Sequence, residues 1–239
     1  MLLEFKCKNH KSIRNEVVFS LLATKDNVNE KYLYDFSNLK VLKSAVIYGA
    51  NGSGKSNFID SILFMKSLVI NSINYQPGTG INYFPHKLNG MESESSYSMQ
   101  FVKDGIRYAY GFSVQQMLVK DEYLYYFPKG RQARIFDRNG LNFEEGSKFK
   151  GRFNNCKEVL KPNRLLLSCA ANFTNIEEIE NSFRFFSEEL VIYSNENQDN
   201  WMQYSLQQFN SNPEIKNLAL SFMREIGIAI KDIEINIGE

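Results

Sequence analysis

The sequence contains few of the residues that build metal sites and disulfide frameworks, with three cysteines and two histidines among 239 residues. Cys7, Cys156 and Cys169 lie far apart in the chain, and none forms a CxxC pair. With only His10 and His86 as additional ligands, this spacing excludes a zinc site and a disulfide scaffold. We expect the cysteines to be buried, reduced thiols of a cytoplasmic protein.

A large excess of charge and a long apolar run are also missing. The formal net charge of +1 excludes a global field that would attract nucleic acid or a membrane surface. No apolar run approaches the ~18 residues of a membrane-spanning helix. The first residues also lack the apolar core of a signal peptide. We therefore expect a cytoplasmic protein with no membrane partner.

The composition is that of a globular protein with ample material for a core. Hydrophobic residues make up 43% of the chain and aromatic residues 14%, which excludes collagen-like and broadly disordered chains. Residues 170–239 carry 4 basic and 12 acidic residues, whereas the part before them is basic. This gradient fits either a polyanion-binding face in the basic part or solvated acidic helices near the C-terminus.

Hydrophobic periodicity predicts the elements of the N-terminal part. Alternation over residues 2–8 and an apolar run over residues 17–22 predict two strands. Residues 24–40 are polar and predict a loop, and the apolar run within residues 42–49 predicts a buried strand. Residues 55–71 carry apolar side chains at helical spacing and predict a helix.

The middle and the last third differ in periodicity. Residues 72–96 are typical of a loop, and alternation with Asp-Gly and Asn-Gly turns predicts an antiparallel β region over residues 97–143. Thr174 and Glu177 form a capping-box pattern at the start of a helix. Asn212 and Pro213 predict the start of another helix, and Gly227 its end. Alternating isoleucines over residues 233–237 predict a final strand.

One motif carries specific chemistry. Residues 49–56 read GANGSGKS and match G-x-x-x-x-G-K-[ST], the phosphate-binding Walker A loop, between an apolar run and a predicted helix. Glycines let successive N–H groups face one phosphate, and the helix adds its positive dipole end. Lys55 is the catalytic candidate, because its ammonium can reach the β- and γ-phosphates. Ser56 is the metal candidate, because its hydroxyl can bind Mg²⁺. The phosphate-binding candidates are Gly49, Ala50, Asn51, Gly52, Ser53, Gly54, Lys55 and Ser56.

Hydrolysis of a triphosphate requires an acidic residue that holds Mg²⁺, usually after four apolar residues. Three stretches approximate this Walker B pattern, at residues 117–122, 190–196 and 228–234. The first is interrupted by Lys120, the second has no aspartate, and the third has its acids on the outward side of the predicted strand. We expect none of them to be a Walker B motif.

Four stretches resemble the N-terminal part of ABC-type ATPases related to SMC, RecF and OLD proteins. They resemble most closely the stand-alone prokaryotic "AAA family ATPase" proteins often encoded near phage-defence genes. Residues 5–13 are similar to the opening strand and F-x-N-F-K-S turn of these proteins, and residues 42–57 are similar to their Walker A region. The β region, with residues 108–112 and 122–125, resembles their β-subdomain, and residues 163–172 resemble their N-x-L-F-L-S-x-A-A segment.

The resemblance implies an ATPase with ATP and Mg²⁺ bound between two head domains. Lys11 and Ser12 match the turn that lies near the nucleotide in that family, and Asn57 follows its Walker A loop. All three are therefore cofactor-binding candidates. The resemblance also implies a homodimer or higher oligomer joined through ATP, whose opening controls a partner such as DNA or a defence effector.

The chain departs from this family in its later motifs. No signature motif, Walker B or switch histidine is recognisable, and His86 falls roughly where the Q-loop glutamine should be. We expect either an N-terminal fragment or a divergent short relative that hydrolyses ATP poorly alone. Two alternatives stay open: a non-catalytic nucleotide-sensing interaction module, and a small-molecule P-loop kinase whose lid is imitated by Arg131, Arg134 and Arg138.

These patterns together predict an α/β P-loop NTPase with an ABC-ATPase-like N-terminal lobe. Residues 1–75 are the predicted nucleotide-binding lobe, and residues 76–160 are an antiparallel β-rich subdomain. Residues 161–239 are a helical segment that ends in a strand and would continue in a complete family member.

Overall fold

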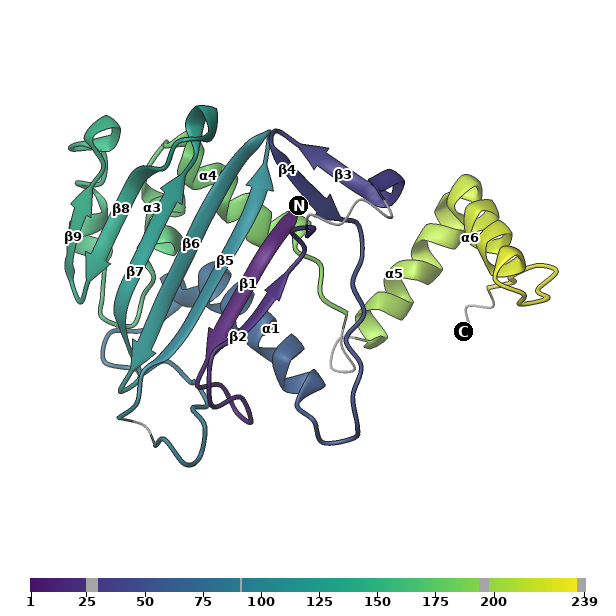
Figure 1. Ribbon diagram of the computed structural model, residues 1–239, viewed down its shortest axis with the longest axis horizontal. Coiled ribbons are helices and arrows are strands. Elements are labelled where there is room, and N and C mark those ends of the chain that lie inside the picture. The colour runs from purple at the N-terminus through teal and green to yellow at the C-terminus, as the bar shows by residue number, and fades with distance from the viewer. Residues whose placement is uncertain (25–29, 91, 194–197, 236–239) are drawn as a thin grey trace. The chain divides into compact units, whose positions relative to one another are not determined.

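The computed structural model describes residues 1–24, 30–90, 92–193 and 198–235. The chain divides into two compact units, residues 1–190 and residues 191–239. The first unit combines an antiparallel sheet with helices on one of its faces, and the second is built from two helices (Figure 1). The chain is therefore of the α/β class, with the antiparallel sheet and helices expected from the sequence. The boundaries near residues 75 and 160 stay a prediction.

The first strand follows the predicted alternation, and the second strand, predicted over residues 17–22, forms over residues 17–20. In β1 (Leu2–Lys8), Leu3, Phe5 and Cys7 are buried, Phe5 and Cys7 against the helix of residues 55–71 and Leu3 against Val41 and Val102. β1 pairs antiparallel with β2 (Val17–Ser20) on one side and with β5 (Ser95–Lys103) on the other. Pairing along both edges holds the turn between β1 and β2 at one end of the sheet.

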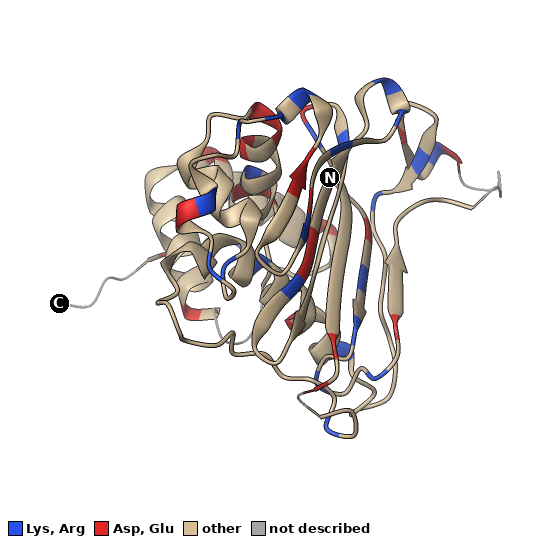
Figure 2. Ribbon diagram, turned by 90° about the vertical axis from the view of Figure 1, so that its left-hand side faces the viewer, with Lys and Arg blue, Asp and Glu red and all other residues tan. Residues whose placement is uncertain are grey.

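The remaining strands form an antiparallel meander, which confirms the β region predicted for residues 97–143. The strand order is β2-β1-β5-β6-β7-β8-β9. Asp104 and Gly105 join β5 to β6 with φ of 49° and 74°, which is the left-handed backbone that a two-residue hairpin turn requires. Basic and acidic residues are interspersed along the strands (Figure 2). The strands after β5 are β6 (Ile106–Gln115), β7 (Leu118–Tyr126), β8 (Ala133–Asn139) and β9 (Asn142–Glu145).

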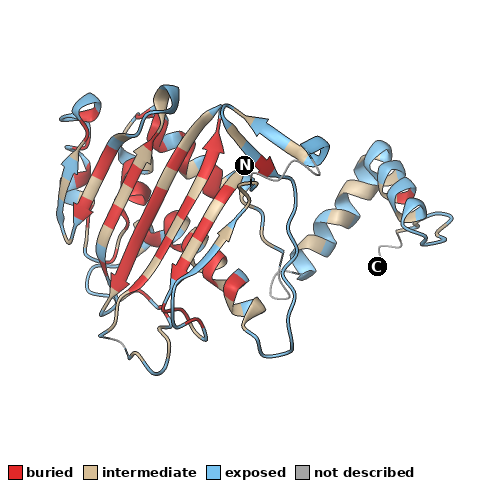
Figure 3. Cartoon of the chain, in the orientation of Figure 1, coloured by how far each residue is buried: buried red, intermediate tan, exposed pale blue. Residues whose placement is uncertain are grey.

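The helices of the first unit cover one face of the sheet and enclose an aromatic core. α1 (Lys55–Asn71) has the predicted bounds, and its buried Phe58 meets Phe5 of β1 edge-on, with ring centroids 5.6 Å apart. Phe185 stacks on Phe101 of β5, with ring centroids 4.1 Å apart. Buried positions alternate along the central strands (Figure 3). The other helical segments are η1 (Glu30–Tyr32), η2 (Ser72–Asn74), η3 (Pro128–Gly130), η4 (Ser147–Phe149), α2 (Cys156–Val159), α3 (Leu166–Phe173), α4 (Glu177–Arg184) and η5 (Phe185–Glu189).

The three cysteines are buried and free, as expected from their spacing. Burial raises the pKa of Cys156 to about 11 and that of Cys169 to about 12, so both are thiols at neutral pH. No helix in the described part of the chain is both long and apolar enough to cross a lipid bilayer.

A buried carboxylate joins the sheet to α3. Glu122 of β7 and Arg138 of β8 form an ion pair at 2.9 Å, and both side chains are fully buried. The same carboxylate accepts hydrogen bonds from the backbone N–H groups of Leu166 and Leu167 at 2.6 and 2.9 Å, at the start of α3. Tyr110 donates a further hydrogen bond at 3.0 Å. Glu122 therefore caps a helix and neutralises a buried arginine at once.

The largest correction concerns the strand predicted within residues 42–49. The structure has β3 (Leu33–Phe36) paired with β4 (Leu39–Leu42), and residues 44–50 follow as exposed chain without regular structure. Val46 is 84% exposed and Tyr48 is 91% exposed. A buried strand needs neighbours on its edges and faces, and no described strand pairs with this segment. The β3–β4 hairpin also corrects the loop predicted for residues 24–40, of which residues 25–29 lie outside the described part.

Two predicted helix signals have different outcomes. Thr174 does not cap α4, because its hydroxyl donates to the carbonyl of Ala170 at 2.8 Å and so ends α3. Asn212 does cap the following helix of the second unit, accepting hydrogen bonds from the N–H groups of Glu214 and Ile215 at 3.1 and 3.4 Å.

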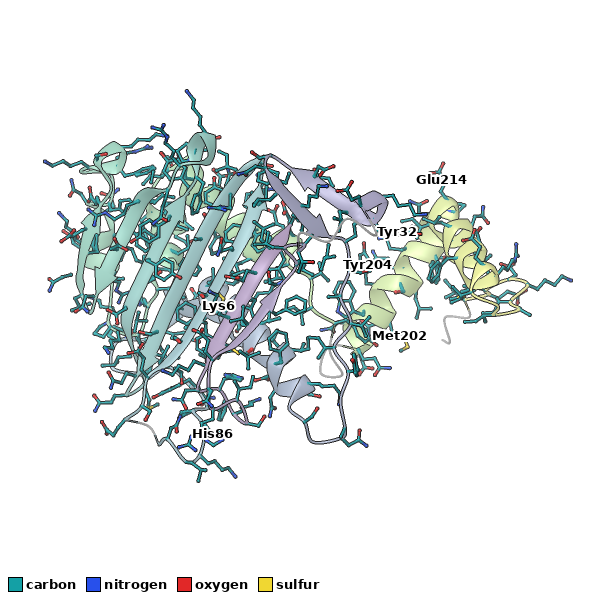
Figure 4. All side chains as sticks on the ribbon, in the orientation of Figure 1. Lys6, Tyr32, His86, Met202, Tyr204 and Glu214 are labelled. Carbon is teal, nitrogen blue, oxygen red and sulfur yellow. The ribbon has the colours of Figure 1, made fainter. Side chains whose placement is uncertain are left out.

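The second unit contains α5 (Gln198–Ser211) and α6 (Pro213–Glu225), as the helical prediction for this part requires. Gly227 has φ of 85° just after α6, which confirms it as the stop. Leu220 is the buried residue of the two helices, whereas Met202 and Tyr204 are exposed on α5 (Figure 4). Residues 233–235 are not a strand, and residues 236 and 237 of the predicted strand lie outside the described residues.

The Glu122–Arg138 pair predicts a large loss of stability when one partner is neutralised. We expect Glu122→Gln to lower the free energy of unfolding by about 3–5 kcal/mol, because Arg138 stays buried without its counter-charge. Urea denaturation measures the change. Asp121→Asn, at the half-buried neighbour, is the control and should lower it by less than about 1 kcal/mol. Equal effects of the two substitutions would contradict a structural role of the buried pair.

Candidate functional site

The glycine-rich loop leads directly into α1, as the motif predicts. Gly52 and Gly54 have φ of 80° and 95°, a backbone that residues with a Cβ rarely adopt. The N–H of Phe58 donates to the carbonyl of Gly54 at 2.9 Å, which starts the helix at the loop. A Cβ on Gly54 would lie 3.1 Å from the hydroxyl oxygen of Ser12. The first N–H groups of α1 have no carbonyl partner within the helix and are suited to an anion.

Lys55 folds back over the loop that precedes it. Its ammonium donates to the carbonyl oxygens of Gly49 and Ala50 at 2.8 and 2.9 Å. Ser53 closes the same turn, its N–H donating to the carbonyl of Ala50 at 3.2 Å. The positive charge therefore lies in the concave side of the loop. A phosphate bound there would replace neutral carbonyls with a charged acceptor, which forms a stronger hydrogen bond.

The turn between β1 and β2 lies beside the loop, 45 positions away in sequence. The amide of Asn57 donates to the hydroxyl of Ser12 at 2.7 Å. The backbone N–H of Lys11 donates to the carbonyl of Phe84 at 2.7 Å, which ties the turn to the segment before β5. The structure thus brings together Ser12, Asn57 and the glycine-rich loop. His86 lies at the same end of the sheet (Figure 4).

Two cavities flank the Ser12–Asn57 contact. The cavity on the loop side has a volume of about 620 Å³ and includes Arg14, Phe19, Tyr48, Gly54 and Lys55 in its lining. The second cavity has a volume of about 680 Å³ and is lined by Lys11, Asn57, Phe84, His86 and Lys87, among others. Ser12 lines both. Either volume is large enough for part of a nucleotide.

Sequence reasoning missed a chain of hydrogen bonds centred on His10, whose outer member Lys11 lines the second cavity. His10 is fully buried, and its Nε2 lies 2.7 Å from a carboxylate oxygen of Asp60 on α1. Its Nδ1 lies 2.8 Å from the hydroxyl of Tyr97 on β5. The ammonium of Lys11 lies 2.7 Å from the same Asp60 oxygen. The one available signal was that Asp60 follows Ser56 by four residues, and so lies on the same face of the helix.

Burial and neighbouring charges set the protonation of this chain. Burial lowers the pKa of His10 below its ordinary value, and the contact with Asp60 offsets only part of that effect. Burial acts to raise the pKa of Asp60, but hydrogen bonds from Lys11 and His10 outweigh it, so that pKa lies below its ordinary value. Burial also raises the pKa of Tyr97. At neutral pH, His10 is neutral, Asp60 is ionised and Tyr97 keeps its proton.

The residues proposed for Mg²⁺ fit only in part. Ser56 is exposed on the first turn of α1, where its hydroxyl can reach a metal bound to phosphates. The Walker B approximation at residues 117–122 ends in Glu122, whose oxygens are committed to Arg138, Tyr110 and α3. Asp232 pairs with Lys216 at 2.8 Å in the second unit, and residues 194–197 are outside the described part. Within the described residues, no group of three acidic, histidine or cysteine side chains could hold a metal.

The three arginines of the β region do not act together. Arg138 is buried with Glu122, and Arg134 pairs with Asp137 and Glu144 at 3.2 and 2.9 Å, whereas Arg131 is exposed after η3. The acidic partners of Arg134 and Arg138 weaken the comparison with a kinase lid.

The lowered pKa of His10 predicts a pH-dependent stability. In the unfolded chain His10 binds a proton near pH 6.5, whereas in the folded chain it does so only at a lower pH. The contribution of neutral His10 to the free energy of unfolding is therefore fully present above about pH 6.5 and is lost as the pH falls toward the folded pKa. The charged and titratable groups that face His10 are Lys11, Asp60 and Tyr97. Urea midpoints measured from about pH 7 to about pH 5 should fall for the wild type and for His86→Gln, but much less for His10→Gln. Equal slopes for all three would contradict this.

Comparison with known protein families finds one match in the region of the site. Residues 44–155, somewhat less than half of the chain, match the family described as "AAA domain, putative AbiEii toxin, Type IV TA system". A search of curated proteins found none that matches. The matched segment contains the glycine-rich loop, Asn57, Asp60 and the strands β5 to β9, but not β1 or the turn that follows it. The match supports a relationship to AAA/ABC-like ATPases, and with it nucleotide binding.

Proposed function

We propose that the chain binds ATP as part of an ABC-type ATPase of the SMC, RecF and OLD kind. The observation that carries this proposal is the contact of Asn57 with Ser12, which places the β1–β2 turn against the glycine-rich loop and α1. The triphosphate lies on the loop and the first turn of α1, with Lys55 on its β- and γ-phosphates. The cavity of about 620 Å³ between the turn and Tyr48 takes the base and ribose.

Mg²⁺ would bind between Ser56 and the β- and γ-phosphates, where it would neutralise negative charge on the nucleotide. The chain's own contribution is to bind and orient the triphosphate through backbone N–H groups, Lys55 and Ser56. In the complete ATPase, two heads joined through ATP would control a partner, DNA or a defence effector. This part of the proposal rests on the resemblance of the sequence.

A second candidate function is nucleotide sensing without hydrolysis. Asp60 is the acidic residue nearest to Ser56 along α1, and it pairs with Lys11 and His10. These contacts occupy a carboxylate that could otherwise bind a metal, which favours binding without hydrolysis. Binding without turnover would let the nucleotide control assembly. Measuring phosphate release by the chain separates the two functions.

Replacement of Lys55 tests the proposal directly. We expect Lys55→Ala to weaken ATP binding by roughly 10- to 100-fold, because a charge-assisted hydrogen bond contributes about 1.5–3 kcal/mol. Isothermal titration of the 239-residue chain with ATP and Mg²⁺ measures the change. The matched control is Lys150→Ala, at an exposed lysine beside η4.

Wild-type affinity in the control and a large loss in Lys55→Ala support the assignment. No binding by the wild type, or equal binding by Lys55→Ala, rejects it. Turnover of ATP at ordinary rates by the wild type would reject the non-catalytic alternative.

A further inference from the structure

The second of the two cavities has no role in the proposed function. Its volume is about 680 Å³, and among the described residues that line it none belongs to the glycine-rich loop of residues 49–56. Ser12 is the one lining residue that it shares with the cavity on the loop side. The volume lies within the range of roughly 300–1,000 Å³ that is usual for small-molecule sites. The cavity is therefore a candidate site for a ligand other than the nucleotide.

One wall of this cavity is apolar and aromatic. Tyr83, Phe84 and Pro85 follow one another along it. Tyr83 is buried, whereas Phe84 is 50% exposed, so part of the Phe84 ring is open to a ligand. Aromatic rings attract other rings in offset-stacked or edge-to-face arrangements. The wall therefore suits a flat, aromatic body.

Hydrogen-bond donors line the rest of the cavity, and no acidic side chain is found among its described lining residues. Lys11 pairs with Asp60 at 2.7 Å, which uses one of the three donors of its ammonium. Lys87 is exposed, and none of the ion pairs in the described part of the chain includes it. Nδ1 of His86 accepts from the N–H of Leu88 at 3.3 Å, so the neutral ring carries its proton on Nε2 and can donate it. Donors of this kind are suited to an anion.

A buried asparagine holds the wall of the cavity in place. Asn9 is 1% exposed and has φ of 57°. Its side-chain oxygen accepts from the backbone N–H of His86 at 2.9 Å and from the side-chain amide of Asn89 at 2.8 Å. Its own amide donates to the carbonyls of Ser93 and Glu94 at 3.2 and 3.1 Å. The segment is thus ordered before a ligand arrives, which lowers the entropic cost of binding.

We propose that this cavity is a second ligand site, which binds a small aromatic compound with a carboxylate or phosphate group. The ring of the ligand lies against Phe84 and Pro85. Its anionic group accepts from Lys87, His86 and the remaining donors of Lys11. Carboxylate and phosphate share the chemistry that these donors recognise, which is a charged oxygen with several lone pairs. The inference goes beyond the proposed function, which assigns the triphosphate, base and ribose to the loop side.

The test adds benzoate or phenyl phosphate to the full chain labelled with ¹⁵N and follows the backbone amide signals by NMR. We expect at least one of these probes to bind with a dissociation constant of about 1 mM or below. It should shift the signals of Phe84, His86 and Lys87 and leave those of residues 49–56 unchanged. Inorganic phosphate lacks the ring and benzyl alcohol lacks the charge. Each should therefore bind at least about ten-fold more weakly, because one of the two contacts is missing.

Substitutions separate the two contacts. Lys87→Ala should weaken binding of the probe about ten-fold, because a charge-assisted hydrogen bond is lost, and Lys87→Arg should retain most of the affinity. Phe84→Ala should remove the preference for the aromatic probe over inorganic phosphate. Both side chains are exposed, so the fold does not depend on them. Lys150→Ala, at the exposed lysine beside η4, is the matched control and should bind the probe as the wild type does.

The outcomes decide between a second site and its alternatives. Binding of only one probe supports the inference and identifies the anionic group. The inference is overturned if neither probe shifts the signals of the cavity, if inorganic phosphate binds equally well, or if Lys87→Ala and Phe84→Ala both bind as the wild type does. Displacement of the probe by ATP with Mg²⁺ would make the cavity part of the nucleotide site and would also overturn it. A wild type that binds the probe but no ATP retains this inference and rejects the proposed function.

Discussion

The pairing of β1 on both of its edges is the constraint on which the site depends. β2 and β5 fix the strand from either side, and α1 packs on its inner face through Phe5 and Phe58. A strand held in three directions cannot shift its register without moving apolar side chains to the wrong face. The turn between β1 and β2 is therefore held in a fixed position beside the start of α1. Ser12 reaches the end of the glycine-rich loop and the start of α1 for this reason.

Local patterns made much of the fold predictable. The glycines of the loop, the 3.6-residue period of α1 and the Asp104-Gly105 turn each act over a few residues, and all three appear as expected. Of the candidates outside residues 49–57, Ser12 lies beside the glycine-rich loop and Asn57, whereas Lys11 lines a cavity with Asn57 but with no residue of the loop. Their roles stay predictions. The loop and the start of α1 form as predicted because their conformation depends on the residues of the motif itself and not on a preceding strand.

The features that were not predictable depend on contacts between distant residues. His10 meets Asp60 across 50 positions, and Glu122 meets the N–H of Leu166 across 44. Neither pair has a fixed spacing that a single sequence can reveal. Glu122 was weighed as a possible metal ligand, but its burial beside Arg138 gives it a structural role instead. The apolar residues before the loop suggested a buried strand, yet hydrophobicity alone cannot supply the neighbouring strands that burial requires.

The exposed segment before the glycine-rich loop has a consequence for the strength of binding. The loop is anchored firmly on its helix side only, since residues 44–50 form no strand and lie in solvent. A ligand that curls the loop must also restrict the backbone upstream, and each ordered residue costs about 1–2 kcal/mol of conformational entropy. Any element that paired with residues 44–50 would remove this cost before the ligand arrived. The affinity of the glycine-rich loop for a phosphate would thus depend on residues 44–48, which precede the loop, through the order of their own backbone.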